Sequence, residues 1–206
     1  MQYSLVTVGA LLCLYALSLP NAAYPYKRIH VLEYMSLALA VRYVMSWKLQ
    51  GRALLFFSVL ATMAFGIHDE LLQGIHPQRT YGLRDVTVDA VSALGGGLLW
   101  NGLALFSRPH TTWYPEDTPA QWRPALFYLF WLVLSVLGFI LPLPGYKNGV
   151  LPYWILIPLT ASLVFWALYH FQLPGKARYG CGVLSCQVFS FFCYPFVINA
   201  YSLPFY

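Results

Sequence analysis

The chain has 206 residues, of which 59% are apolar and only 9% are charged, whereas an ordinary soluble domain has roughly 25% charged residues. Its formal charge of +5 comes from basic residues dispersed along the chain, without the basic cluster typical of nucleic-acid-binding proteins. This composition argues against a soluble enzyme and a nucleic-acid partner, and it predicts an integral membrane protein.

Continuous apolar runs close to the roughly 20 residues needed to cross a bilayer recur along the whole chain, without the alternation typical of barrel strands. We therefore predict an all-α fold, a polytopic helical membrane bundle with about seven transmembrane helices. The expected spans are 3–19, 30–47, 53–73, 85–106, 124–141, 150–171 and 181–201. Four precede a polar loop, which predicts a core at 1–106 and C-terminal membrane helices at 107–206, together forming one integrated domain.

The first span could instead be a signal peptide, because small residues follow Pro20. However, residues 1–7 contain no Lys or Arg, so the positively charged region that opens a signal peptide is missing. We expect a retained helix.

The orientation follows from basic residues in short loops, which favour the cytoplasmic side. The N-terminal side holds Lys48, Arg52, Arg108, Arg123, Lys176 and Arg178, and the opposite side holds Lys27, Arg28, Arg79, Arg84 and Lys147. If Arg79 and Arg84 are kept by a site, the remaining charges favour a cytoplasmic N-terminus. Segment 74–84 would then be extracytoplasmic, and Arg42 is expected to snorkel to the cytoplasmic surface.

Four of the seven acidic residues lie between positions 68 and 97. At the end of the third span, Asp69 and Glu70 are spaced to share a helix face with Gln73. Gly74 and Pro77 predict the end of that helix.

The fourth span begins with a further pair of acids. Asp85 is expected as its N-cap or first-turn residue, and Asp89 follows one turn later. His30 and Glu33 begin the second span. Because consecutive helices alternate in direction, these polar ends are predicted to meet at one membrane face.

Charges inside a span need partners or water, because each costs about 2.5–3.5 kcal/mol on insertion scales. The candidates close in sequence are Arg79, Arg84, His30 and His68. Two interpretations stay open. Glu70, Arg79 and Asp85 could form a structural ion-pair network, or the group could form a ligand-binding pocket.

The motif Lys27-x-x-His30-x-x-Glu33-Tyr34-x-x-Leu37, followed by Glu70-x-x-Gln73-x-x-x-Pro77-x-Arg79 and by Asp85, resembles the VanZ-like family of bacterial membrane proteins. The resemblance covers about residues 1–106. Asp89 stands where the family usually has Asn, and Ser92 where it commonly has Gly. The resemblance implies a connection with reduced susceptibility to the glycopeptide teicoplanin, without implying a biochemical reaction.

On the pocket interpretation, arginine forks bind an anionic headgroup of an envelope lipid or a related ligand, and acids and histidines transfer protons. The candidate catalytic residues are Glu70, Asp85 and His30. The candidate ligand-binding residues are Glu33, Asp69, Gln73, Arg79, Arg84 and Asp89. The alternative is a noncatalytic integral subunit that packs into a larger membrane complex, with the C-terminal half as scaffold or docking surface.

A metal site is a weaker interpretation. His30, His68 and His76 could join the carboxylates as ligands, but no pair has the His-x-x-x-His spacing. We expect no metal and no cofactor.

Other motifs indicate structural roles. Gly95, Gly96 and Gly97 lie inside an apolar span, which favours close helix packing. Ser92 lacks the context of a nucleophile elbow. The cysteines, at positions 13, 181, 186 and 193, are expected as buried thiols.

Overall fold

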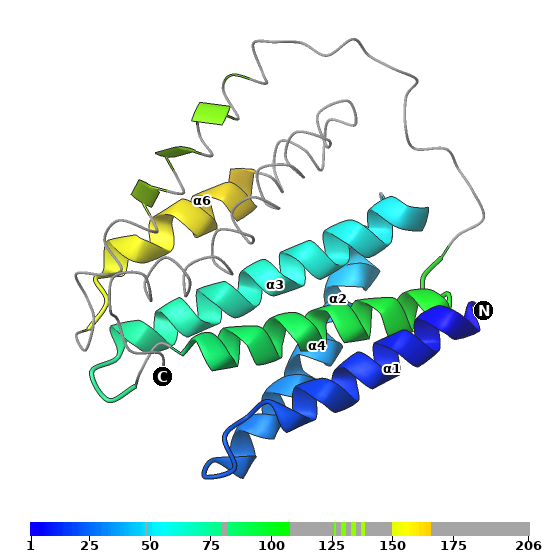
Figure 1. Ribbon diagram of the computed structural model, residues 1–206. Helices are drawn as coiled ribbons and strands as arrows, with labels where there is room; N and C mark the ends of the chain where they lie inside the picture. The colour runs from blue at the N-terminus through cyan, green and yellow to red at the C-terminus, as the bar shows by residue number, and fades with distance from the viewer. Residues whose placement is uncertain are drawn as a thin grey trace. The chain divides into compact units, whose positions relative to one another are not determined.

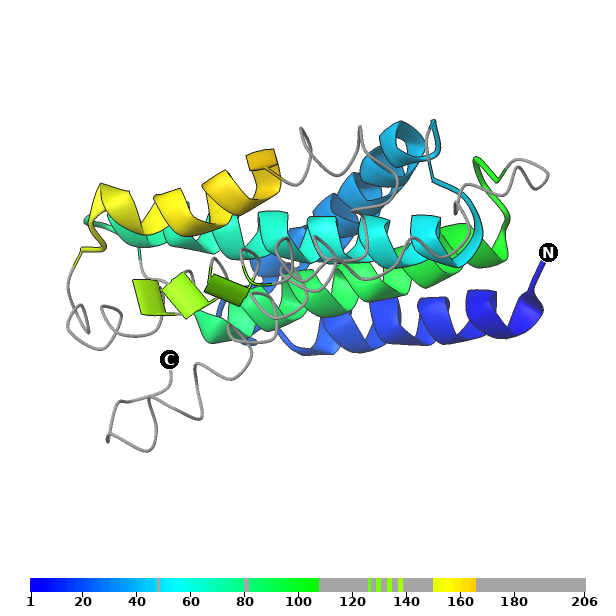
Figure 2. The same ribbon diagram turned by 90° about the horizontal axis from the view of Figure 1, so that it is seen from above.

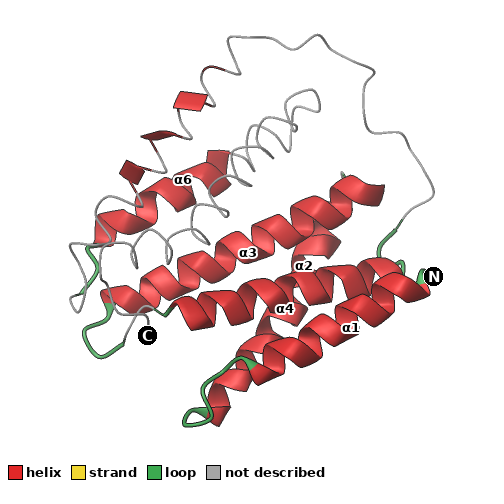
Figure 3. Cartoon of the chain, in the orientation of Figure 1, coloured by secondary structure: helices red, strands yellow, loops and turns green. Residues whose placement is uncertain are grey.

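The computed structural model describes residues 1–47, 49–79, 82–107 and 150–165, together with positions 126, 129, 130, 133, 134, 137 and 138. Its elements are α1 (Tyr3–Ser18), η1 (Pro25–Arg28), α2 (Ile29–Met45), α3 (Gly51–Ile75), α4 (Leu83–Gly102), η3 (Tyr153–Leu156) and α6 (Ile157–Phe165). All of these described elements are helical (Figure 3). The predicted all-α class is confirmed.

Helices α1 to α4 correspond to the first four predicted spans, with bounds that differ by a few residues. The fifth and seventh predicted spans lie largely or wholly outside the described residues, and the sixth is described only as far as residue 165. Among the described helices, α3 with 25 residues is long and apolar enough to cross a membrane, whereas α1 is apolar but has 16 residues.

The chain divides into two compact units. The first comprises Met1–Gly66 and Arg84–Trp113, and the second comprises Ile67–Leu83 and Tyr114–Tyr206. Helix α3 therefore contributes residues to both units.

In the first unit, α4 packs against three helices through its glycine triplet. A Cβ on Gly95 would lie 2.7 Å from the Cys13 sulfur of α1, and one on Gly96 would lie 3.0 Å from the Met35 Cα of α2. A Cβ on Gly97 would lie 2.2 Å from a methyl carbon of Val59 on α3. Consecutive residues point about 100° apart around a helix, so three glycines in a row allow close approach on three sides. The predicted close packing is confirmed.

Helices α1 and α4 run side by side in both views of the ribbon (Figures 1 and 2). The Gln2 amide donates a hydrogen bond to the Gly102 carbonyl over 2.8 Å. Cys13, Ala16, Val31 and Val88 form a buried cluster that joins α1, α2 and α4. The described cysteine, Cys13, is a buried free thiol, as predicted.

Helix α4 ends at Gly102, so the prediction that it continues to Phe106 was wrong. The Leu105 amide bonds the Trp100 carbonyl, and the Ala104 amide bonds the Asn101 carbonyl. Together with Ala104 at φ 57°, these two bonds form a Schellman motif. The motif ends the helix immediately after its last turn.

Arg42 packs against this turn. Its Nε donates to the Leu105 carbonyl over 2.8 Å, and one of its terminal nitrogens donates to the Ser107 hydroxyl over 3.2 Å. Arg42 is only 1% exposed. The prediction that it snorkels to the surface was wrong, because the turn after α4 supplies acceptors beside α2.

In the second unit, α3 ends at Ile75, as the Gly74 and Pro77 pattern predicts. His68 hydrogen-bonds Thr160 of α6 through Nε2 and Oγ1 over 2.8 Å. The Leu151 amide donates to the Gly74 carbonyl over 2.9 Å. These two bonds link the end of α3 with α6 and with the segment that precedes it.

Candidate functional site

The first unit contains an ion pair between η1 and α4. Lys27 Nζ donates to Asp85 Oδ2, with the two side chains 29% and 9% exposed. Asp85 lies in the first turn of α4, where the positive end of the helix dipole stabilises a carboxylate. Its prediction as a first-turn acid is confirmed.

His30 lies between two further carboxylates. Its Nδ1 is 3.4 Å from Asp89 Oδ1 on α4 and 3.6 Å from Glu33 Oε2 on its own helix. Asp89 is 1% exposed, whereas the Glu33 side chain is 56% exposed. The imidazole therefore connects a buried carboxylate with one that solvent reaches.

Tyr34 packs beside His30, and Gly66 packs beside Asp89. The ring of buried Tyr34 is parallel to that of His30, with centroids 6.4 Å apart. A Cβ on Gly66 would lie 2.9 Å from Asp89 Cβ and 3.1 Å from a ring carbon of Tyr34. Glycine at this position therefore lets α3 pack directly over Asp89 and bury it.

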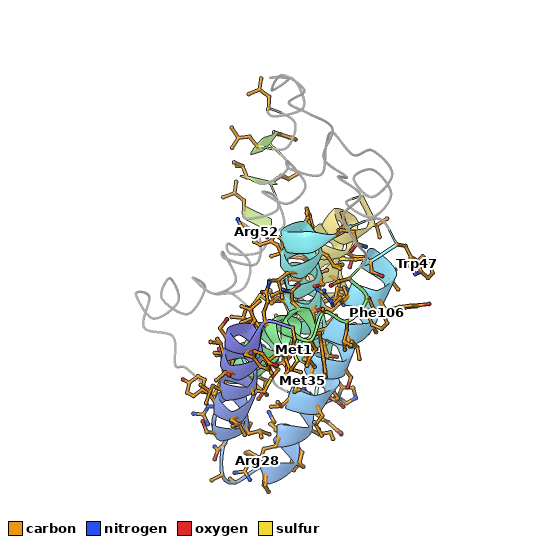
Figure 4. The ribbon with its side chains drawn as sticks, turned by 90° about the vertical axis from the view of Figure 1, so that its right-hand side faces the viewer. Met1, Arg28, Met35, Trp47, Arg52 and Phe106 are labelled. Atoms are coloured by element: carbon orange, nitrogen blue, oxygen red, sulfur yellow. The ribbon has the colours of Figure 1, made fainter. Side chains whose placement is uncertain are left out.

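Positive side chains lie outside these buried carboxylates. Arg28 directly follows Lys27, and Arg84 directly precedes Asp85. Both arginines are exposed. We call Lys27, Arg28 and Arg84 the cationic rim. Figure 4 shows Arg28 at one end of this unit, with Trp47, Arg52 and Phe106 towards the other.

The second unit holds the acids at the end of α3. Gln73 Nε2 donates to Asp69 Oδ2 over 3.1 Å, which confirms the predicted shared face. Glu70 is fully buried, and its Oε2 accepts the Gly82 amide over 3.1 Å. Glu70 thus holds the chain just before α4 by a bond to the backbone.

Asp85 binds Lys27, which was not among the partners that the sequence offered for the buried acids. Arg79 and Arg84 are exposed, and within the described part of the chain their side chains form no ion pair. These contacts give no support to the structural ion-pair network of Glu70, Arg79 and Asp85, which was one of the two open interpretations.

Of the candidate residues, the first unit brings together His30, Glu33, Asp85 and Asp89, and the second holds Asp69, Glu70 and Gln73. Convergence of the two groups stays a prediction. Lys27 was not predicted as the partner of Asp85. Its position three residues before His30 was the available signal, because residues at this spacing lie on the same side of a helix. The bond from His68 to Thr160 had no signal in the sequence.

The first-unit group suits proton transfer. A histidine beside a buried carboxylate is held in one orientation and can take or give a proton through its other nitrogen. His30, Glu33 and Asp89 also offer one imidazole and two carboxylates, which are ligand types that divalent cations accept. The expectation of no metal stays a prediction.

No family model, curated protein or solved structure matches the chain. The fold and the site define an all-α protein in which a partly buried histidine lies beside a buried carboxylate, next to a cationic rim. The VanZ-like resemblance stays a prediction.

Proposed function

We propose that this is a multi-pass protein of the bacterial cytoplasmic membrane that binds an anionic envelope-lipid headgroup, or a related anionic ligand, at the cationic rim. The observation that carries the proposal is the arrangement of charge. Arg28 and Arg84 are exposed and Lys27 is partly exposed, while Asp85 and Asp89 are buried. An approaching anion meets three positive groups and one exposed carboxylate, that of Glu33, and the buried carboxylates are already paired with Lys27 or set against His30.

Membrane insertion is supported by the surface of the first unit as well as by the length of α3. Large apolar side chains are exposed along two of its helices, among them Leu11, Leu14, Tyr15, Leu32, Tyr43 and Val44. An apolar surface of this kind is costly in water and favourable in a bilayer. A seven-span bundle with a cytoplasmic N-terminus is the arrangement we propose.

The rim residues suit a phosphate group. Arginine presents a planar fork that matches two phosphate oxygens, and Arg28 and Arg84 have no described ion partner to displace. Lys27 is held in place by Asp85 and adds a point charge. Contacts with Asp89 and Glu33 orient the His30 imidazole. If the ligand is processed, this imidazole would be the proton-transfer group.

Native mass spectrometry of the detergent-extracted full chain tests this proposal. We expect a phosphate-bearing lipid to be retained at low detergent and its retention to fall about tenfold or more in the Arg28→Gln, Arg84→Gln double variant. That estimate follows from losing a charge-assisted hydrogen bond of about 1.5–3 kcal/mol. Arg79→Gln removes an exposed arginine of the second unit, which is not part of the rim, and is the matched control.

Equal loss of this lipid in the control would contradict the assignment to the rim. A protein partner present in stoichiometric amount, without lipid, would favour the alternative of a noncatalytic subunit in a larger membrane complex. If the VanZ-like resemblance holds, the double variant should also lose any effect of the protein on teicoplanin susceptibility in cells.

A further inference from the structure

The guanidinium of Arg42 is buried at the end of the first unit opposite to the cationic rim. Two of its nitrogens donate to the Leu105 carbonyl and the Ser107 hydroxyl. Its third nitrogen is buried without a hydrogen-bond partner. Tyr43 holds the turn in place, since its ring packs edge-on against Phe106 with centroids 5.0 Å apart.

No carboxylate in the described part of the first unit lies beside this guanidinium. Glu33, Asp85 and Asp89 belong to the cluster around Lys27 and His30, near the starts of α2 and α4. Arg42 instead lies near the end of α2 and contacts the turn that follows α4. A buried charge without a counterion is strongly unfavourable, so an anion bound at this end of the unit would be stabilised by Arg42.

The surrounding charges point the same way. Exposed Arg52 begins α3 shortly after the end of α2, and the sequence places Lys48 before it and Arg108 directly after Ser107. All are positive, which raises the local concentration of anions. With the N-terminus in the cytoplasm, as proposed above, this end would face the inner leaflet, whose anionic lipids attract basic groups.

We propose that Arg42 and Ser107 form a second anion site, specific for a phosphate group. Ser107 is exposed, so the guanidinium lies directly beneath a side chain that solvent reaches. The Ser107 hydroxyl accepts from Arg42 and keeps its own proton to donate. A phosphate has enough oxygens to accept from this hydroxyl and from the unpartnered nitrogen together. The phosphate comes either from a lipid headgroup or from free solution.

Thermal unfolding of the full chain in neutral detergent tests this site. The probes are sodium phosphate and dihexanoyl phosphatidylglycerol, each compared with sodium chloride at equal ionic strength. We expect Tm to rise above the chloride value. Ser107→Ala should weaken the apparent affinity about tenfold, the effect of losing one hydrogen bond to a charged group.

Ser18→Ala is the matched control, because this exposed serine lies at the end of α1 and its hydroxyl donates to the Tyr15 carbonyl within its own helix. It should bind both probes as the parent does. Arg42→Lys keeps the positive charge but loses the fork, so it should bind more weakly than the parent even where it folds normally.

A response to both probes supports recognition of the phosphate group itself, and a response to the lipid probe alone supports the headgroup as its source. The proposal is overturned if neither probe exceeds chloride. It is also overturned if Ser107→Ala binds as tightly as the parent.

Discussion

Replacing Gly9 with alanine tests how tightly α1 and α4 are packed. A Cβ at this position would lie 2.6 Å from both the Gly95 carbonyl oxygen and the Leu99 amide nitrogen, which are backbone atoms that cannot rotate away. Reaching an ordinary contact of 3.4 Å requires the helices to separate by about 0.8 Å (3.4 − 2.6). That shift would also strain the hydrogen bond from Gln2 to Gly102.

Overpacking of this kind costs about 1–3 kcal/mol, and the higher helix propensity of alanine returns up to about 1 kcal/mol. Because the clash is with backbone, we expect a net loss of about 1–2 kcal/mol in the free energy of unfolding. At about 2–4 °C per kcal/mol for a chain of this size, Tm should fall by about 2–8 °C.

Differential scanning fluorimetry of the purified full chain in detergent measures this shift. The control is Val8→Ala, which trims an exposed neighbour on the same helix and should change the free energy of unfolding by less than about 0.5 kcal/mol. A Gly9→Ala variant as stable as the parent, or more stable, would refute the close crossing of the two helices.

Three further predictions follow from individual contacts. A double-mutant cycle of Lys27→Gln and Asp85→Asn, read by thermal unfolding, should return a coupling energy of about 1–3 kcal/mol, and additive effects would show that the ion pair contributes nothing. Glu70→Ala should speed hydrogen exchange at the Gly82 amide. Glu70→Gln should largely preserve the protection of this amide, because the side-chain amide oxygen can still accept. Equal exchange rates in the two variants would contradict the bond from the Gly82 amide to Glu70. Trp100→Phe removes the indole donor to α2 and should cost about 1 kcal/mol, which a Tm equal to that of the parent would contradict.

Helices α1 to α4 could be predicted from sequence because their apolar runs are long, and α1 and α3 end at clear signals, Pro20 and Gly74 respectively. The end of α4 could not. A left-handed residue after a helix is usually glycine, but Ala104 takes that conformation here. Without a glycine to mark the turn, the apolar stretch up to Phe106 looked helical.

The site could be predicted only in part. Alternation of helix direction placed His30 and Asp89 at the same end, and the structure brings them together. Lys27 and Asp85 are 58 positions apart, and a search for partners close in sequence passes over such a pair. Arg42 was misjudged because snorkelling assumes that the nearest polar environment is the membrane surface, whereas the turn after α4 provides it.

Photo-crosslinking from Tyr26 in living cells tests the proposed headgroup site most directly. Tyr26 is 68% exposed and precedes Lys27, so p-benzoyl-phenylalanine at this position replaces one aromatic ring with another beside the rim. We predict adducts enriched in phosphate-bearing anionic lipids relative to the bulk lipid extract, with the enrichment lost when Arg28 and Arg84 are both changed to Gln. Adducts to a single protein partner, or lipid adducts with the bulk composition, would contradict headgroup binding at the cationic rim.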